Sequence, residues 1–270
     1  MANPILNDKT WNKAARDPGW AAPDPDTRRT PITDGPISGW HSQVMTVGGT
    51  ISATGVLMVV LLAAAVVGWQ MGPANSGSQV GRFPALALGG VLIGFACAIA
   101  IYFKPMWAKF LGPVYAVGEG FFLGVISKAY ENFQHGIVVQ AVGATLGVFL
   151  VMLFLYRTKI IKVTDRFRKI VITATLGLMA FYLVSFVIRL VAGAGSVSFL
   201  NSPSGLGIAF SIFAAGLAAM NLALDFDFIE RGAKQGLPKG MEWFGAFALV
   251  VTLVWLYLEL LRLLSKLQRR

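Results

Sequence analysis

Long stretches of this chain contain no Asp, Glu, Lys or Arg. Five of them cover residues 35–81, 83–103, 170–188, 190–224 and 243–258. Two more, 110–127 and 133–156, hold one titratable group each, Glu119 and His135. A helix that crosses a bilayer needs ~20 mostly apolar residues, and its backbone groups must pair within the segment. The runs are continuously apolar rather than alternating, which favours helices over barrel strands.

The pattern predicts an all-α polytopic membrane protein with seven spans. We expect them at residues 47–71, 83–103, 110–127, 136–156, 170–191, 206–228 and 241–264. Residues 1–43 are polar and proline-containing, which predicts a mostly disordered tail. Residues 44–267 then form the transmembrane domain, and residues 268–270 form a basic end. Small residues recur four apart, as in Gly120/Gly124 and Gly143/Gly147, and we interpret them as close helix packing.

Composition supports a membrane protein without a soluble catalytic domain. Hydrophobic residues make up 56% of the chain and charged residues only 13%, about half the ~25% of a globular protein. The single cysteine, Cys97, excludes a disulfide within one chain. Neither His41 nor His135 has a partner at metal-ligand spacing. Because no phosphate-binding loop or Ser/His/Asp set appears either, we expect no enzyme activity and no cofactor.

The formal charge of +10 would suggest nucleic acid for a soluble protein, but its distribution gives a better explanation. With the N-terminus and the second, fourth and sixth loops on one side, that side holds 16 Lys and Arg residues and the other holds six. Lys and Arg concentrate in cytoplasmic loops. We therefore expect a multi-pass protein of the cell (plasma) membrane with a cytoplasmic N-terminus. We expect its partner to be the lipid bilayer rather than nucleic acid.

Three acids lie in or near the predicted spans, at Glu119, Asp225 and Glu259. Inserting a charged side chain at the middle of the membrane costs ~2.5–3.5 kcal/mol on insertion scales. Such residues therefore usually face the interior of the helix bundle and have a functional role. Glu119 lies between two glycines, with Tyr115 on the same face. It is either a functional group or a neutral acid bonded to a neighbouring helix.

The segment from Asn221 to Arg231 has the densest polar signal. Asn221 and Asp225 share a helix face, whereas Asp227 points nearly the opposite way, since two residues rotate by ~200°. Asp227 is expected to pair with Arg231 four residues later. Asp225 is thus the better interior candidate, and Asp227 an interfacial ion pair.

Glu259 lies in a Trp-Leu-Tyr-Leu-Glu run that starts at Trp255. Its alternatives are an interior acid and a local pair with Arg262 near the membrane surface. The basic residues that follow, Lys266, Arg269 and Arg270, are interpreted as a solvated end.

The acidic segment 222–230 and the Leu-Tyr-Leu-Glu run at 256–259 resemble the last two helices of the Bax inhibitor-1 (YccA-like) membrane family. That family has Tyr-Asp in its sixth helix and Leu-Tyr-Leu-Asp in its seventh. Here Leu224 replaces the tyrosine and Glu259 replaces the second aspartate. The resemblance implies six helices around a central seventh, and a pH-sensitive calcium leak controlled by a carboxylate pair. Asp225 and Glu259 would be that pair, with calcium near them.

Chain length opposes a direct contact within this pair. Asp225 is about ten residues before the expected turn at 235–238 and Glu259 over twenty after it. In a straight hairpin they would miss each other by ~18 Å, so they meet only if residues 231–247 include a non-spanning excursion. Two other functions stay open: a proton-coupled transporter, and a non-transporting regulator of membrane proteases or other membrane proteins.

Overall fold

The computed structural model describes residues 44–72, 85–192 and 202–269. The chain divides into two units, Met1–Ser42 and Gln43–Arg270, and only the second is described below. The expectation of a disordered tail at residues 1–43 falls outside the described residues.

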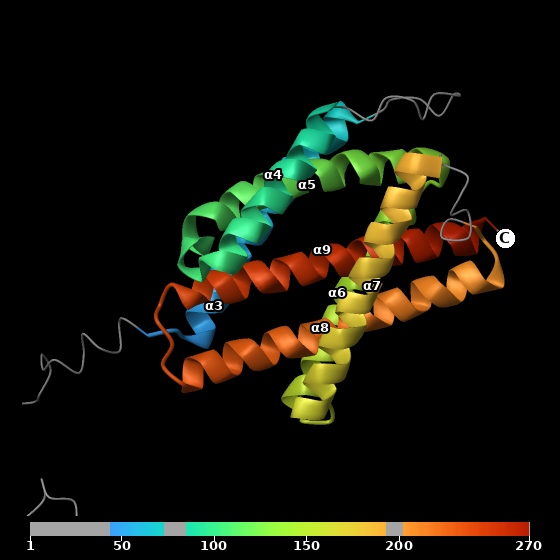
Figure 1. Ribbon diagram of the computed structural model, residues 1–270. Coiled ribbons are helices and arrows are strands. Elements are labelled where there is room, and N and C mark those ends of the chain that lie inside the picture. Colours follow the sequence, from blue (N-terminus) through green and yellow to red (C-terminus); the bar gives the residue numbers. More distant parts are fainter. Residues whose placement is uncertain (1–43, 73–84, 193–201, 270) are drawn as a thin grey trace, which may run out of the picture. The chain divides into compact units, whose positions relative to one another are not determined.

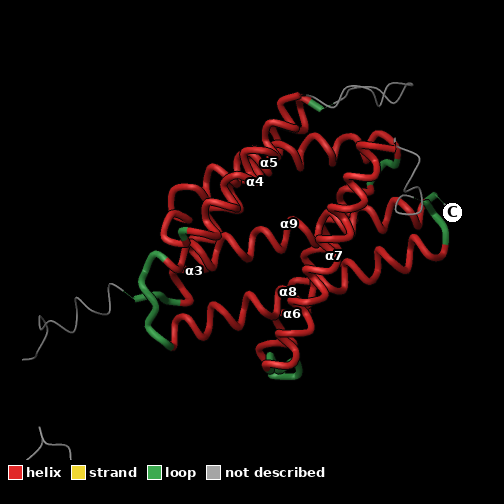
Figure 2. Tube along the Cα trace, viewed as in Figure 1, coloured by secondary structure: helices red, strands yellow, loops and turns green. Residues whose placement is uncertain are grey.

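Seven long α-helices and one short 3₁₀ turn make up the described part of the second unit (Figures 1 and 2). They are α3 (Val47–Met71), α4 (Ala85–Phe103), η2 (Pro105–Trp107), α5 (Ala108–Phe133), α6 (Ile137–Arg157), α7 (Asp165–Ala192), α8 (Gly205–Lys234) and α9 (Met241–Gln268). Six of these helices are long and apolar enough to cross a membrane, and α4 provides a shorter apolar one, Gly89–Phe103. The predicted all-helical membrane bundle is confirmed.

Local signals explain where several helices begin. Thr46 caps α3, its side chain accepting a hydrogen bond from the Gly49 amide, and Ser204 caps α8 by accepting one from the Gly207 amide. Such caps pair amide groups that have no partner within the helix. The α5, α7 and α8 helices extend beyond the predicted apolar spans. The outer turns of these helices carry charged residues. A prediction from uncharged stretches leaves such residues out, although they are compatible with a helix.

The last helix, α9, is central, as expected. It packs against α3 and α5 on one side and against α6 and α8 on the other. In Figure 1 the red α9 runs between the α3–α5 group and the orange α8. Its Phe247, Val250 and Val254 join one apolar cluster with α3 and α5. Its Leu249 and Leu256 join a second cluster with α6 and α8.

Glycines bring α3 and α5 into backbone contact. A Cβ atom at Gly120 would lie 2.2 Å from the Leu61 carbonyl oxygen, and one at Gly124 would lie 2.0 Å from the Ala65 carbonyl oxygen. The predicted packing role of this pair is therefore correct. For Gly143 and Gly147 on α6 the same prediction is wrong, because no atom of the described residues outside the helix itself lies within 4 Å of a Cβ atom at either position.

Successive helices alternate in direction, so the loops gather at two ends. At one end the Met45 amide donates to the Leu237 carbonyl oxygen over 2.7 Å, and Gly240 lies against Met106 of η2. At the other end Gln268 near the C-terminus donates to Gln140 of α6 over 3.0 Å. The N-terminal end of α3 and the C-terminal end of α9 thus lie at opposite ends of the bundle.

Candidate functional site: a polar seam between α7, α8 and α9

Polar side chains recur every seven residues on two of the last three helices. On α7 they are Arg168, Thr175 and Tyr182, and on α9 they are Thr252, Glu259 and Lys266. Seven residues are close to two helical turns, so each set lies on one face. Every member of the α7 set bonds to a residue of α8 or α9. We call these six residues, together with Ser211, Asn221, Asp225 and Asp227 of α8, the polar seam.

The antiparallel pairing of α8 and α9 determines the order of groups along the seam. Asp225 of α8 faces Thr252 of α9, and Ser211 of α8 bonds to Lys266 of α9. Asp225 and Ser211 are fourteen residues apart on α8, and Thr252 and Lys266 are fourteen residues apart on α9. The two contacts therefore belong to one antiparallel register of these helices. Lys266 is therefore ~21 Å from Thr252 along the helix axis, and Glu259 lies midway. Most of the ~30 Å thickness of a bilayer core is thus spanned by polar groups.

Asp225 lies in the middle part of the α8–α9 interface. Its carboxyl oxygen Oδ2 is inaccessible to solvent and has no hydrogen-bond partner among the described residues. No Lys or Arg of the described chain forms an ion pair with it. One turn away, the Asn221 amide donates to Thr175 Oγ1 of α7 and to the Leu217 carbonyl oxygen, both over 2.9 Å. The Asn221 side chain thus links α8 to α7, whereas Asp225 Oδ2 has no hydrogen-bond partner among the described residues.

Glu259 is 2% exposed and combines the two alternatives that its sequence left open. Its Oε1 accepts a hydrogen bond from the Tyr182 hydroxyl over 2.8 Å and pairs with Arg262 over 3.4 Å. Arg262 also donates to the Tyr182 hydroxyl over 3.0 Å. The expected local pair is present, yet Oε2 is buried without a partner in the described part of the chain. Glu259 is therefore both an interior acid and half of a local ion pair.

The structure does not bring Asp225 and Glu259 into contact. Both α8 and α9 are continuous helices that flank a short turn, so the excursion that a contact required is absent. Asp225 faces Thr252, seven residues before Glu259, which separates the two carboxyl groups by about 10 Å along the helix axis. Direct coupling of two titrating groups needs ~4–6 Å. A shared proton is therefore not supported in this conformation, although both acids lie on one seam.

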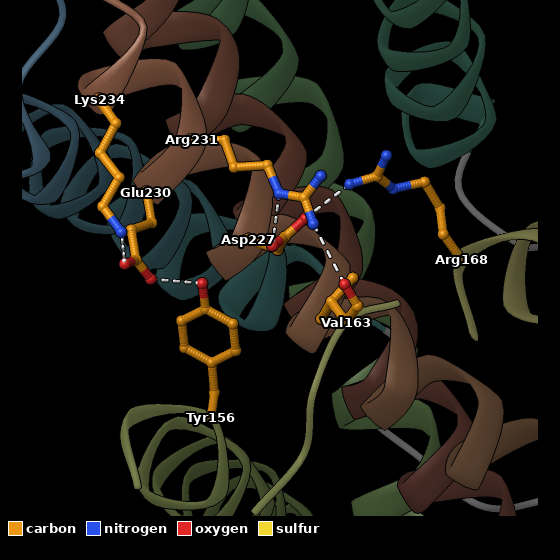
Figure 3. A network of polar contacts seen from close by, with 7 residues as sticks. All are labelled: Tyr156, Val163, Arg168, Asp227, Glu230, Arg231 and Lys234. Carbon is orange, nitrogen blue, oxygen red and sulfur yellow. Dashed lines mark hydrogen bonds and ion pairs between the residues drawn. The ribbon is translucent and has the colours of Figure 1, made fainter. Parts of the chain in front are cut away.

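Asp227 is a buried junction between helices and does not face away from the bundle, contrary to what its position on α8 suggests. It is 7% exposed, and the predicted pair with Arg231 is present at 2.8 Å. A second arginine, Arg168 of α7, binds its other oxygen at 2.7 Å. Arg231 also donates to the Val163 carbonyl oxygen over 3.1 Å, so one carboxylate holds α7, α8 and the loop between α6 and α7 together (Figure 3).

A neighbouring network on α8 is more exposed. Figure 3 shows Glu230 between Lys234 of its own helix and Tyr156 of α6. The Tyr156 hydroxyl donates to Glu230 Oε2 over 2.5 Å. Because the Glu230 and Lys234 side chains are 43% and 71% exposed, this pair lies at the rim of the bundle.

Glu119 lies apart from the seam, at the interface of α4 and α5. Its Oε2 would be 3.2 Å from a Cβ atom at Gly94 of α4, and Tyr115 borders the same glycine. The missing side chain at Gly94 thus makes room for the carboxyl group. Among the described residues, no hydrogen bond or ion pair links Glu119 to α7, α8 or α9. The structure places Glu119 next to α4 but shows no hydrogen bond from it to that helix among the described residues, so both alternatives stay predictions.

Six of the ten seam residues were not predicted as site residues: Arg168, Thr175, Tyr182, Ser211, Thr252 and Lys266. Tyr182 and Lys266 belong to the seven-residue repeats, a signal present in the sequence. Lys266 is 2% exposed, so the interpretation of it as part of a solvated end is wrong. Glu242 at the start of α9 accepts hydrogen bonds from the Thr46 amide and hydroxyl over 2.9 and 2.8 Å, and thereby fastens α9 to the start of α3.

The described residues contain no group of three or more His, Cys, Asp or Glu side chains placed to hold a metal ion. The acids of the seam are instead distributed along it one at a time. Such an arrangement suits weak, successive contacts with a passing cation better than a resident metal, since conduction requires sites from which an ion can leave.

Six helices around a central α9, with acids buried between the last three helices, define a class of polytopic membrane proteins. Comparison with protein families assigns the chain within that class. It matches the Bax inhibitor 1 like family over residues 3–269, nearly its full length, and belongs to that family. A comparison with curated proteins found no match.

Proposed function

We propose that this protein is a pH-sensitive calcium leak of the plasma membrane, with the polar seam as the cation path and no enzyme activity. The observation that carries the proposal is the pair of buried, unpartnered carboxyl oxygens, Asp225 Oδ2 and Glu259 Oε2. An unpartnered buried polar atom costs stability, and such groups in membrane proteins mark ion paths. Calcium is a hard cation that prefers carboxylate and carbonyl oxygens.

The two acids act in series in this proposal. A cation that leaves the Asp227 end of the seam would meet Asp225, then the amide and hydroxyl oxygens of Asn221 and Thr175, and then Glu259. Protonation neutralises each carboxyl group and changes its attraction for the cation, so flux depends on pH at both steps. Family membership supports the same activity, because a pH-sensitive calcium leak is what the resemblance implies.

The test is calcium flux from liposomes that contain only the purified protein, measured at one acidic and one alkaline pH. Asp225→Asn and Glu259→Gln keep the shape of each protonated acid. Each is expected to lower flux at least about tenfold, equal to about 1.4 kcal/mol of lost cation stabilisation, and to weaken the pH dependence. Glu230→Gln is the matched control on the same helix, because its carboxylate is at the rim.

The other outcomes separate the alternatives. Wild-type flux that is unchanged by either substitution would exclude the seam as the path. Loss of flux in Glu119→Gln alone would move the path to the α4–α5 interface. Flux that runs only with a proton gradient would favour a proton-coupled transporter. A complete absence of flux would favour a non-transporting regulator of membrane proteins.

We propose a cytoplasmic location for the end that holds the N-terminus of α3. The loop between α6 and α7 at that end is exposed and basic, with Lys159 and Lys162 among its cations, and such loops stay in the cytoplasm. In a variant with Cys97→Ala, single cysteines at Lys162 and Lys239 are expected to react with an impermeant reagent only from the cytoplasmic side. Cysteines at His135 and Arg269 are expected to react only from outside. Labelling of Arg269→Cys from the cytoplasm would show that α9 does not cross.

A further inference from the structure

Lys266 is a buried cation at the outer end of the seam. It is 2% exposed, and its Nζ donates to the Gly207 carbonyl oxygen over 2.8 Å and to Ser211 Oγ over 2.7 Å. Both acceptors are neutral, and Lys266 forms no ion pair with any described residue. No acid occurs between residues 190 and 224, so the chain that leads into α8 cannot neutralise it. Lysine is almost never fully buried unless it is paired.

Lys266 lies on the same face of α9 as Glu259. It lies two turns beyond Glu259 on the same face of α9, at about 10 Å along the axis, with Arg262 between them. A carbonyl and a hydroxyl oxygen are also the kinds of ligand that bind hard cations. The ammonium thus occupies a position, lined by oxygen atoms, that a cation approaching Glu259 from this end would otherwise use.

We propose that Lys266 is a tethered cation that occupies the outer end of the seam and keeps divalent cations away from Glu259. This inference rests on the proposed function, because it concerns the cation path along the polar seam. It makes Lys266 a residue that determines ion selectivity. Repulsion scales with the charge of the approaching ion, so calcium is opposed more strongly than potassium. The wild-type leak is therefore slow for divalent cations entering from the C-terminal side.

The experiment compares Lys266→Met, which removes the charge at similar length, with Lys266→Arg, which keeps it. Gln268→Ala, outside the seam at the same end of α9, is the matched structural control, because it removes the hydrogen bond to Gln140 and leaves the ammonium in place. Calcium binding to the purified proteins is measured by calorimetry. From the repulsion between a unit charge and a divalent ion at about 10 Å, we expect Lys266→Met to bind calcium at least about fivefold more tightly than the wild type. Lys266→Arg and Gln268→Ala are expected to bind it like the wild type.

Two further measurements assign the gain to Glu259 and to permeation. Adding Glu259→Gln to Lys266→Met is expected to abolish the tighter binding. In liposomes, Lys266→Met is expected to raise the ratio of calcium to potassium flux at least about fivefold for the same electrostatic reason. If Lys266→Met does not fold, Lys266→Gln takes its place, since its amide can still donate to the Gly207 carbonyl oxygen.

Equal calcium affinity in the wild type and the neutral variant would overturn the inference and leave Lys266 as a structural link between α8 and α9. The same conclusion follows if Gln268→Ala tightens binding as much as Lys266→Met does. Failure of the proposed function is distinguishable, because proteins that pass no cation at all can still be compared by calorimetry.

Discussion

Gly124→Ala is expected to destabilise the protein markedly, although it adds a single methyl group in an apolar interface. That methyl carbon would lie 2.0 Å from the Ala65 carbonyl oxygen and 2.7 Å from the Trp69 amide nitrogen. Both atoms belong to the α3 backbone and cannot rotate away, so the two helices must separate. Overpacking costs about 1–3 kcal/mol, which lowers the melting temperature by about 3–10 °C in a chain of this size.

Gly147→Ala on α6 is the matched control, because its Cβ position has no neighbour within 4 Å in the part of the chain that the structure describes. Alanine favours helix over glycine by up to about 1 kcal/mol, so this variant is expected to melt at the same temperature or slightly above the wild type. Melting curves in one detergent decide the comparison. Similar losses in both variants would show that α3 and α5 do not pack as closely as the structure has them.

The number and position of the helices could be predicted from sequence because lipid imposes a simple rule. A window without charge either spans the membrane or is buried, and Val47–Met71 was predicted to the residue. The rule fails at helix ends, where charged residues continue the helix through the interface. For that reason α8 runs to Lys234, past Glu230 and Arg231, instead of ending at residue 228.

The partners of the buried polar groups could be predicted only within a helix. The pairs of Asp227 with Arg231 and of Glu259 with Arg262 follow from helical spacing, and both are present. The bonds from Tyr182 to Glu259 and from Lys266 to Ser211 join residues 77 and 55 positions apart. They depend on the register between helices, about which hydrophobicity along one segment carries no information.

The two glycine pairs illustrate the same limit. Gly120/Gly124 and Gly143/Gly147 have identical spacing, yet only the first lies against another helix in the described structure. Spacing shows that a smooth helix face exists. Which neighbour it meets is decided by the arrangement of the whole bundle.

Asp227→Asn is expected to loosen the end of the bundle at which α7 and α8 meet. Its carboxylate accepts from Arg168 at 2.7 Å and from Arg231 at 2.8 Å, with its own side chain only 10% exposed. An amide removes the negative charge and leaves two arginines close together. Breaking a fully buried pair costs about 3–5 kcal/mol. Because both arginines are partly exposed, at 38% and 43%, we expect a loss of about 1–3 kcal/mol.

The loop between α6 and α7 should report this change directly. Arg231 also holds that loop through the Val163 carbonyl oxygen, so Asp227→Asn is expected to speed tryptic cleavage at Lys159 and Lys162 and to lower the melting temperature. Glu230→Gln, three residues later on α8, is the control, because an exposed ion pair contributes only about 0–1 kcal/mol. It should leave both measurements nearly unchanged. If the two variants behave alike, Asp227 is an ordinary rim carboxylate, and the arginine pair does not hold α7 against α8.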